Sequence, residues 1–306
     1  MNDRGPLAAH AVRLTLAAIV AASTAASASA QHANFVLFGA PSAEALEVPD
    51  YRRAVAPLTS PFYADDAFIT SDVRGVWMHH SFPEPRVGGG SVTAYALQLR
   101  VALTKSLQLV ASKLGALDFD SPLADGESGS TDVAVGLKWA FLQDWKSDTH
   151  ASVGLGYQAG VGDEEVLQGS DEVRLWGALN KNAGRFHFGM TANYLVAVGE
   201  EDALGDSDRL FVHLHSDYWF DQFYSAVFEL NYYDTVRGNS GSPYSYTGVD
   251  LANLGGGSSN DACTFGYGFE LRPASAFALR VAHESKLSGS DTVFGHRWTL
   301  SAQWSF

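Results

Sequence analysis

From about residue 70 to the end of the sequence, large apolar side chains occupy every second position of successive short segments. The last segment, 294–306, shows this best, with aromatic and aliphatic residues on one side and Gly, Ser, Thr, Arg and Gln on the other. Successive side chains of a strand point to opposite faces, so the pattern predicts strands with one apolar and one polar face. After the first thirty residues no helical periodicity of any length is found, which argues against a helical fold.

About twelve segments share this alternation, which predicts an all-β, antiparallel fold. They lie near 70–81, 91–103, 107–118, 131–142, 149–160, 171–181, 185–198, 208–219, 223–235, 261–271, 276–286 and 294–306. An apolar face must be buried or lie against lipid, and both a soluble sandwich and a membrane barrel satisfy that need. The lengths of the connections between the segments distinguish the soluble sandwich from the membrane barrel.

Short and long connections alternate along the chain. The short ones are 104–106, 143–148, 182–184, 220–222 and 272–275, and the long ones are 82–90, 119–130, 161–170, 199–207, 236–260 and 287–293. The long loops are rich in Asp and Glu, whereas aromatic residues gather near the short turns. Short periplasmic turns, long extracellular loops and an aromatic girdle are typical of transmembrane β-barrels of the bacterial outer membrane. We therefore expect such a barrel, in a Gram-negative type of cell.

The composition excludes several other classes. Among 306 residues, 20 Lys+Arg stand against 34 Asp+Glu, a net charge of −14 that argues against a nucleic-acid partner. A single Cys excludes an internal disulfide framework and a Cys-x-x-Cys metal or redox site. The mean hydropathy of −0.05 is too low for a bundle of membrane helices, but it is what alternating apolar and polar residues average to.

The first thirty residues predict a secretory signal peptide. Arg4 and Arg13 precede a short apolar run, and small residues end at Ala30, the expected cleavage site for the secretion translocase and signal peptidase. Residues 31–69 contain four prolines and little periodicity, so they predict an irregular periplasmic or plug segment. Residues 70–306 are expected to form the barrel.

The polar face of the predicted strands carries charges of both signs, which a hydrated lumen would explain. We expect these side chains to line the pore: Arg100, Lys138, Arg174, His213, His215, Asp217, Glu229, Glu270, Arg280 and Arg297. Antiparallel pairing would bring His187 near Asp217 and Glu229 near His213. Imidazole and carboxylate groups at this spacing suit a metal ion or a pH response, but a hydrogen-bonded polar lining is the favoured interpretation. No metal or cofactor is therefore expected.

His79 and Ser81 raise a second hypothesis, an outer-membrane lipid hydrolase. A twelve-stranded outer-membrane phospholipase uses a His-x-Ser dyad, which this pair resembles. In that enzyme Asn and Gly follow the Ser, whereas Phe82 and Pro83 follow it here. A nucleophile also needs a base and a group that orients the base, and spacing alone shows neither. The expectation is that the protein is not an enzyme.

Two resemblances add to these predictions. The alternation of Trp298, Leu300, Trp304 and Phe306 resembles the C-terminal signal strand that the barrel assembly machinery recognises. The blocks 57–77, 95–115, 132–141 and 248–256 are similar to transporter-like outer-membrane barrels grouped with the meta-pathway phenol-degradation family. That resemblance implies a barrel that passes small, often aromatic or hydrophobic compounds, and it brings no catalytic motif.

The sequence thus predicts an outer-membrane channel or transporter for small solutes. Its expected surroundings are outer-membrane lipid and lipopolysaccharide. The third hypothesis is a structural or surface-interaction barrel without transport. Eight strands enclose a space that side chains fill, whereas sixteen leave a channel, so about twelve strands leave the openness of the lumen undecided.

Overall fold

The structure is a computed structural model that describes residues 35–47, 54–122, 126–198, 207–237, 260–289, 292 and 294–306. The predicted signal peptide and the block 248–256 lie outside the described residues. No helix of the described part is long and apolar enough to cross a membrane.

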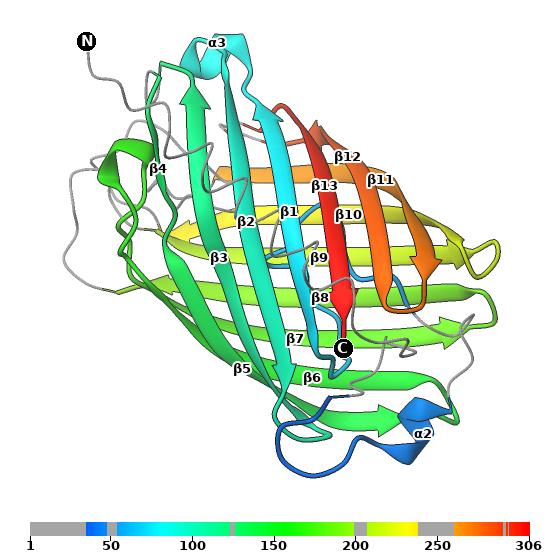
Figure 1. The fold of residues 1–306 in the computed structure, drawn as a ribbon. Coiled ribbons are helices and arrows are strands. Elements are labelled where there is room, and N and C mark those ends of the chain that lie inside the picture. Colours follow the sequence, from blue (N-terminus) through cyan, green and yellow to red (C-terminus); the bar gives the residue numbers. More distant parts are fainter. Residues whose placement is uncertain are drawn as a thin grey trace.

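Twelve antiparallel strands close into a barrel, as the alternation predicted (Figure 1). They are β1 (Asp72–Ser81), β2 (Ser91–Ala102), β3 (Leu107–Asp120), β5 (Val133–Asp144), β6 (Thr149–Ala159), β7 (Glu172–Ala183), β8 (Phe186–Ala197), β9 (Asp208–Trp219), β10 (Tyr224–Arg237), β11 (Asn260–Ala274), β12 (Phe277–Ser288) and β13 (His296–Ser305). Each pairs with its neighbours in the chain, and β1 pairs with β13 to close the ring. The short β4 (Ser128–Ser130) pairs with the far end of β3.

The two ends of the barrel differ as the connections predicted. Helix α3 (Glu84–Val87), strand β4 and the 3₁₀ turn η2 (Glu164–Val166) lie in the long connections at one end (Figure 1). The opposite end carries the short turns and helix α2 (Ala43–Leu46). By the usual orientation of such barrels, the long-loop end is extracellular and the short-turn end is periplasmic.

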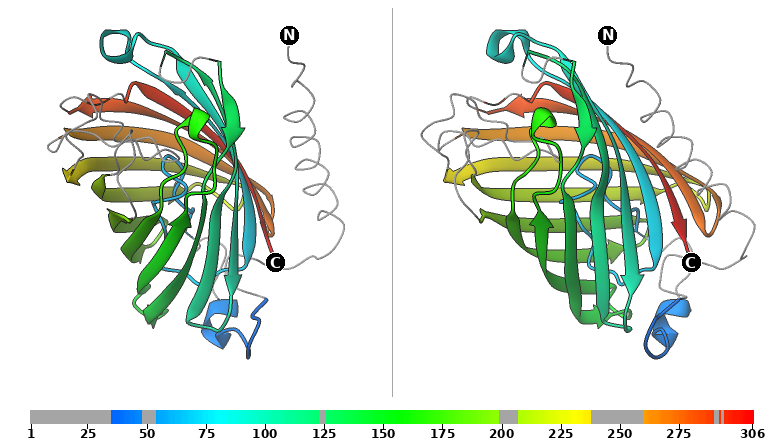
Figure 2. Two further views of the ribbon diagram at one scale, coloured as in Figure 1. Left: turned by 90° about the vertical axis from the view of Figure 1, so that its left-hand side faces the viewer. Right: turned by 60° about the vertical axis from the view of Figure 1, so that its left-hand side comes forward.

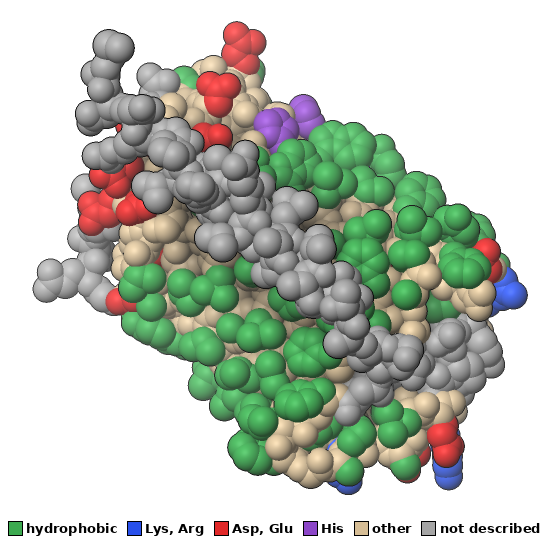
Figure 3. All heavy atoms as spheres, in the orientation of Figure 1, with side chains coloured by type: hydrophobic (Ala, Val, Ile, Leu, Met, Phe, Trp, Pro, Cys, Tyr) green, Lys and Arg blue, Asp and Glu red, His purple; other side chains and the backbone are tan. Residues whose placement is uncertain are grey.

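The outer surface is a band of apolar side chains that point away from the barrel. Trp139, Leu155 and Phe269 are 54%, 60% and 58% exposed, although each lies in the middle of a strand. Figure 3 shows apolar side chains over the strands, with charged side chains towards the ends. A soluble protein would not expose such a band, whereas the hydrocarbon core of a membrane covers it.

The space inside the barrel is filled by side chains and by residues 54–71. This segment has no helix or strand, yet almost all of its residues are buried. Its hydrogen bonds reach from β1 and β2 to β13, so it lies within the space that the strands enclose (Figures 1 and 2).

Gly154 of β6 leaves the space that the Trp176 side chain of β7 occupies. A Cβ atom at position 154 would lie 2.1 Å from the indole Cζ2 atom. We therefore predict that Gly154→Val lowers the free energy of unfolding by about 1–3 kcal/mol, the usual cost of overpacking. Urea unfolding in lipid vesicles measures it. A Cβ at position 177 would lie no closer than 3.8 Å to its nearest neighbour, the Ser152 carbonyl oxygen, so Gly177→Val is the control. Equal stabilities of the two variants would contradict the prediction.

Candidate functional site

The candidate site is the interior of the barrel, where the wall meets residues 54–71. Nine of the ten predicted lining residues are at most 6% exposed: Arg100, Lys138, His213, His215, Asp217, Glu229, Glu270, Arg280 and Arg297. Arg174 is partly buried and also bonds to the segment. The structure therefore places all ten on the inner side of the wall.

Side chains of the wall donate hydrogen bonds to the backbone carbonyl oxygens of residues 54–71. Arg174 donates from both terminal nitrogens, to the carbonyls of Phe62 and Tyr63 at 2.8 Å each. Further bonds join Arg74 to Pro57, Arg297 to Thr59, Gln98 to Pro61, Lys138 to Asp66 and Gln108 to Thr70. A buried segment without secondary structure needs such partners, because unpaired backbone groups are costly away from water.

Carboxylates of the wall accept hydrogen bonds from backbone amides of the same segment. Glu229 of β10 accepts the amides of Leu58 at 2.9 Å and Thr59 at 2.7 Å, and it also accepts the Thr59 hydroxyl. Asp217 of β9 accepts the amide of Val55 at 3.1 Å. Side chains of the wall thus form hydrogen bonds with both the carbonyl oxygens and the amides of residues 54–71.

Two acidic residues of the segment form ion pairs with cations of the wall. Arg100 Nη1 lies 3.0 Å from Asp66 and 3.7 Å from Asp65, and Lys138 Nζ lies 3.5 Å and 3.3 Å from the same two carboxylates. Arg100 also pairs with Asp72 at 2.8 Å. All these side chains are at least nine-tenths buried, so removing one partner would leave an uncompensated charge in the interior.

The predicted histidine and carboxylate groups form one connected chain of hydrogen bonds. His187 Nδ1 lies 2.7 Å from the Asp217 carboxylate. His215 bridges the two carboxylates, with Nε2 3.1 Å from Asp217 and Nδ1 2.7 Å from Glu229. The predicted proximity of His187 and Asp217 is confirmed. The predicted partner of Glu229 is wrong by two residues, because the strand register pairs Glu229 with His215 and pairs His213 with Asn231.

No group of three or more His, Cys, Asp and Glu side chains among the described residues is arranged to hold a metal ion. The remaining predicted lining residues form internal pairs. Arg280 lies 2.7 Å from Glu270, and Arg297 lies 2.6 Å from Glu284.

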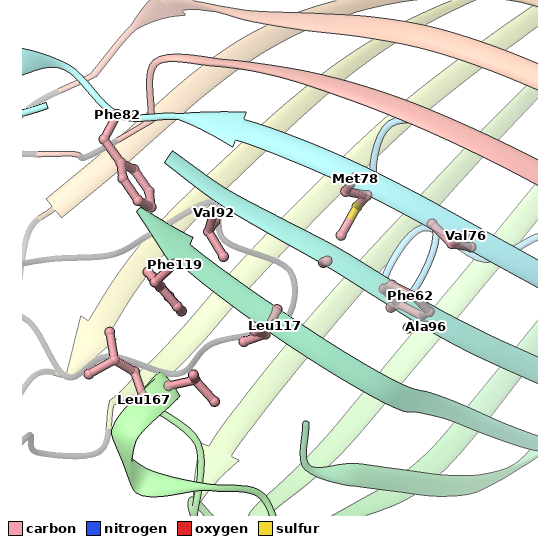
Figure 4. Packing of buried hydrophobic residues seen from close by; sticks show 11 residues of the cluster. Phe62, Val76, Met78, Phe82, Val92, Ala96, Leu117, Phe119 and Leu167 are labelled. Atoms are coloured by element: carbon pink, nitrogen blue, oxygen red, sulfur yellow. The ribbon is translucent and has the colours of Figure 1, made fainter. Parts of the chain in front are cut away.

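The inner face of β1–β3 is apolar towards the long-loop end. Figure 4 shows this cluster, to which Val76, Met78, Val92, Ala94, Ala96, Leu117 and Phe119 contribute from the three strands. The alternation predicted a polar lining on this face, so the apolar cluster is a correction to that prediction. The available signal was that Val76 and Met78 flank Trp77, so both faces of that strand are apolar.

A second buried apolar cluster lies at the same end of the interior. It consists of Tyr63, Leu195, Phe211, Tyr233, Ala262 and Phe294, from the inner segment, β8, β9, β10, β11 and the residues before β13. The long-loop end of the interior therefore combines these apolar side chains with buried ion pairs such as Arg209–Glu172, whereas His187, Asp217 and the Arg280–Glu270 pair lie towards the short turns.

His79 and Ser81 lie on the outer side of β1, where alternate residues are partly exposed. His79 Nδ1 lies 3.0 Å from the Thr93 hydroxyl of β2, and its ring stacks on Trp77. Among the described residues no hydrogen bond joins His79 to Ser81. The His79 ring is therefore paired with Thr93 rather than with Ser81.

The predicted assembly signal lies in β13 and at the chain end beside it. Trp298 and Leu300 face outward and are 43% and 45% exposed, and Trp304 and Phe306 are partly exposed. The amide of Phe306 donates to the carbonyl of Ser71, just before β1. Recognition of these residues by the assembly machinery stays a prediction.

The chain matches no family model and no curated protein. Its structure is similar to that of an outer membrane channel from Pseudomonas putida F1, with 14% identity, a TM-score of 0.59 and coverage of 83% of this chain and 100% of that chain. The KdgM and NanC porins match at 11% identity each and TM-scores of 0.47 and 0.48, over 77% of this chain and 99% and 98% of theirs. The chain therefore has the fold of an outer-membrane β-barrel, and its apolar outer band agrees with that location.

Proposed function

We propose that this protein is an outer-membrane channel for small solutes, and that the solutes are hydrophobic or aromatic. The observation that carries the proposal is the apolar inner face of β1–β3. The interior of an outer-membrane barrel is ordinarily polar, because water fills it. An apolar inner wall at the long-loop end favours solutes that leave water readily.

The proposal includes residues 54–71 as a plug that moves when solute passes. The segment fills the interior, and its contacts are hydrogen bonds and ion pairs rather than strand pairing. Such contacts can be exchanged for water one at a time, whereas the strands of the wall stay paired. The resemblance of 57–77 and 95–115 to barrels of the meta-pathway phenol-degradation family favours the same class of solute.

The test is uptake by intact Gram-negative cells that lack their general porins, because lipopolysaccharide is a barrier to hydrophobic compounds. We expect cells producing the protein to take up labelled toluene several times faster than cells with the empty vector. Uptake of arabinose, which is polar and of similar size, is expected to stay near the control. Equal uptake of toluene with and without folded protein would reject the channel and favour a structural barrel.

A further inference from the structure

A β-bulge turns one lysine of the wall into the interior. Ser112 and Lys113 are consecutive in β3, yet both are buried, and the register between β2 and β3 shifts at this point. The backbone of Lys113 has φ of 62°, a left-handed conformation that residues other than glycine rarely adopt. Bulges of this kind redirect a side chain, and they are common beside functional sites.

The ammonium group of Lys113 is bonded to uncharged groups. It donates to the Tyr63 hydroxyl and, at 2.6 Å, to Gln158 Oε1, while the residue is 3% exposed. In the part of the chain that the structure describes, no carboxylate forms an ion pair with it. Lys138, which is equally buried, pairs with Asp65 and Asp66. A buried charge ordinarily needs a counter-charge. Lys138 has one, whereas Lys113 has none among the described residues.

The ammonium group lies against one aromatic ring, in a recess that contains others. This small recess of about 30 Å³, lined by Phe62, Tyr63, Lys113, Gln158, Arg174 and Trp176 among others, lies between the inner segment and β3, β5, β6 and β7. Lys113 Nζ lies 4.5 Å from the centre of the Tyr63 ring, and the Arg174 guanidinium carbon lies 4.4 Å from that of Trp176.

The acidic groups near the recess have other partners. Glu172 lines the recess but forms an ion pair with Arg209. Asp132 is connected to Lys113 only through Gln158, whose amide nitrogen donates to the Asp132 carboxylate at 3.0 Å. The Asp132 carboxylate also accepts hydrogen bonds from the backbone amides of Gly162 and Gly169. The recess therefore presents a cation and aromatic faces to any molecule that enters it.

We propose that this recess widens as the Tyr63 side chain moves aside and then binds a small organic anion, with its carboxylate on Lys113 and its apolar body against Trp176 and the Tyr63 ring. The carboxylate would take the place of the Tyr63 hydroxyl as an acceptor and supply the counter-charge that Lys113 lacks. As a station for solute on its way through the barrel, the site rests on the channel function proposed above. Equilibrium binding of the anion can be measured whether or not solutes pass through the barrel.

The experiment is equilibrium dialysis of the folded protein in detergent micelles with labelled benzoate and with benzamide, its neutral analogue. Micelles without protein provide the background. We expect benzoate to bind at least about tenfold more tightly than benzamide, and Lys113→Met to remove this preference. Lys146→Met, at an exposed turn of the opposite end, is the matched control and is expected to keep it.

A second variant guards against a loss of folding. Tyr63→Phe keeps the ring but removes the hydroxyl that accepts from Lys113, so we expect it to bind benzoate more tightly than the unchanged protein. Damage to the structure would instead weaken binding. Equal affinities for benzoate and benzamide, no binding of either, or unchanged binding by Lys113→Met would overturn the proposal. If benzoate binds as expected but toluene uptake fails, the channel function alone is rejected.

Discussion

A disulfide bond between positions 59 and 266 is expected to abolish conductance, and its reduction is expected to restore it. Thr59 belongs to the inner segment, and Gly266 lies on the inner side of β11. A Cβ atom at position 266 would lie 3.3 Å from the Thr59 Cβ, close to the range of about 3.5–4.5 Å that disulfides span. Because the bond ties the segment to the wall, passage that requires its displacement must stop.

The experiment uses Thr59→Cys combined with Gly266→Cys, in a chain whose single native cysteine is changed by Cys263→Ser. Conductance is measured in planar bilayers before and after addition of a reductant to the same membrane. The two single-cysteine variants, which cannot form the bond, are the controls and should not respond to the reductant. If the oxidised and reduced double variant conduct equally, the segment is not the plug.

Replacing Glu229 by glutamine is expected to have the opposite effect and to open the channel more often. The carboxylate accepts two amides and a hydroxyl of the segment, besides His215. A neutral amide keeps the shape, but only one of its two polar atoms accepts hydrogen bonds. Hydrogen bonds to charged groups contribute about 1.5–3 kcal/mol each, so losing one or two favours release by about 3 kcal/mol, roughly a hundredfold.

The measurement is the fraction of time that single channels of Glu229→Gln spend open, compared with the unchanged protein. Glu165→Gln, at an exposed position of a long loop, removes the same charge without touching the segment. Adding the disulfide between positions 59 and 266 to Glu229→Gln should close the channel again. An unchanged open fraction in Glu229→Gln would show that these hydrogen bonds do not hold the segment in place.

The strands were predictable because their signal is local. Alternation depends only on neighbours in sequence, so even the end of β9 at Trp219 agrees with prediction. The pairing of His187 with Asp217 followed from one loop length, whereas a different register at the next turn moved Glu229 to His215.

The interior was less predictable, because it depends on contacts between residues far apart in the chain. Residues 54–71 carry no periodicity, and their partners come from strands as distant as β13. The bulge at Lys113 breaks the alternation of β3 by a single residue, which the pattern alone does not separate from an ordinary strand end. Only the closed barrel shows which side chains this lysine meets.

The contacts of residues 54–71 also bear on the order in which the barrel is assembled. The segment is synthesised before every strand, yet the carbonyl of Thr59 is held by Arg297 of the last strand, while the amides before it are held by β9 and β10. Its docking place therefore does not exist until the final hairpin has joined β1. We therefore expect the proposed plug to dock only after the strands have closed, and a barrel that lacks its last strand to make the outer membrane permeable.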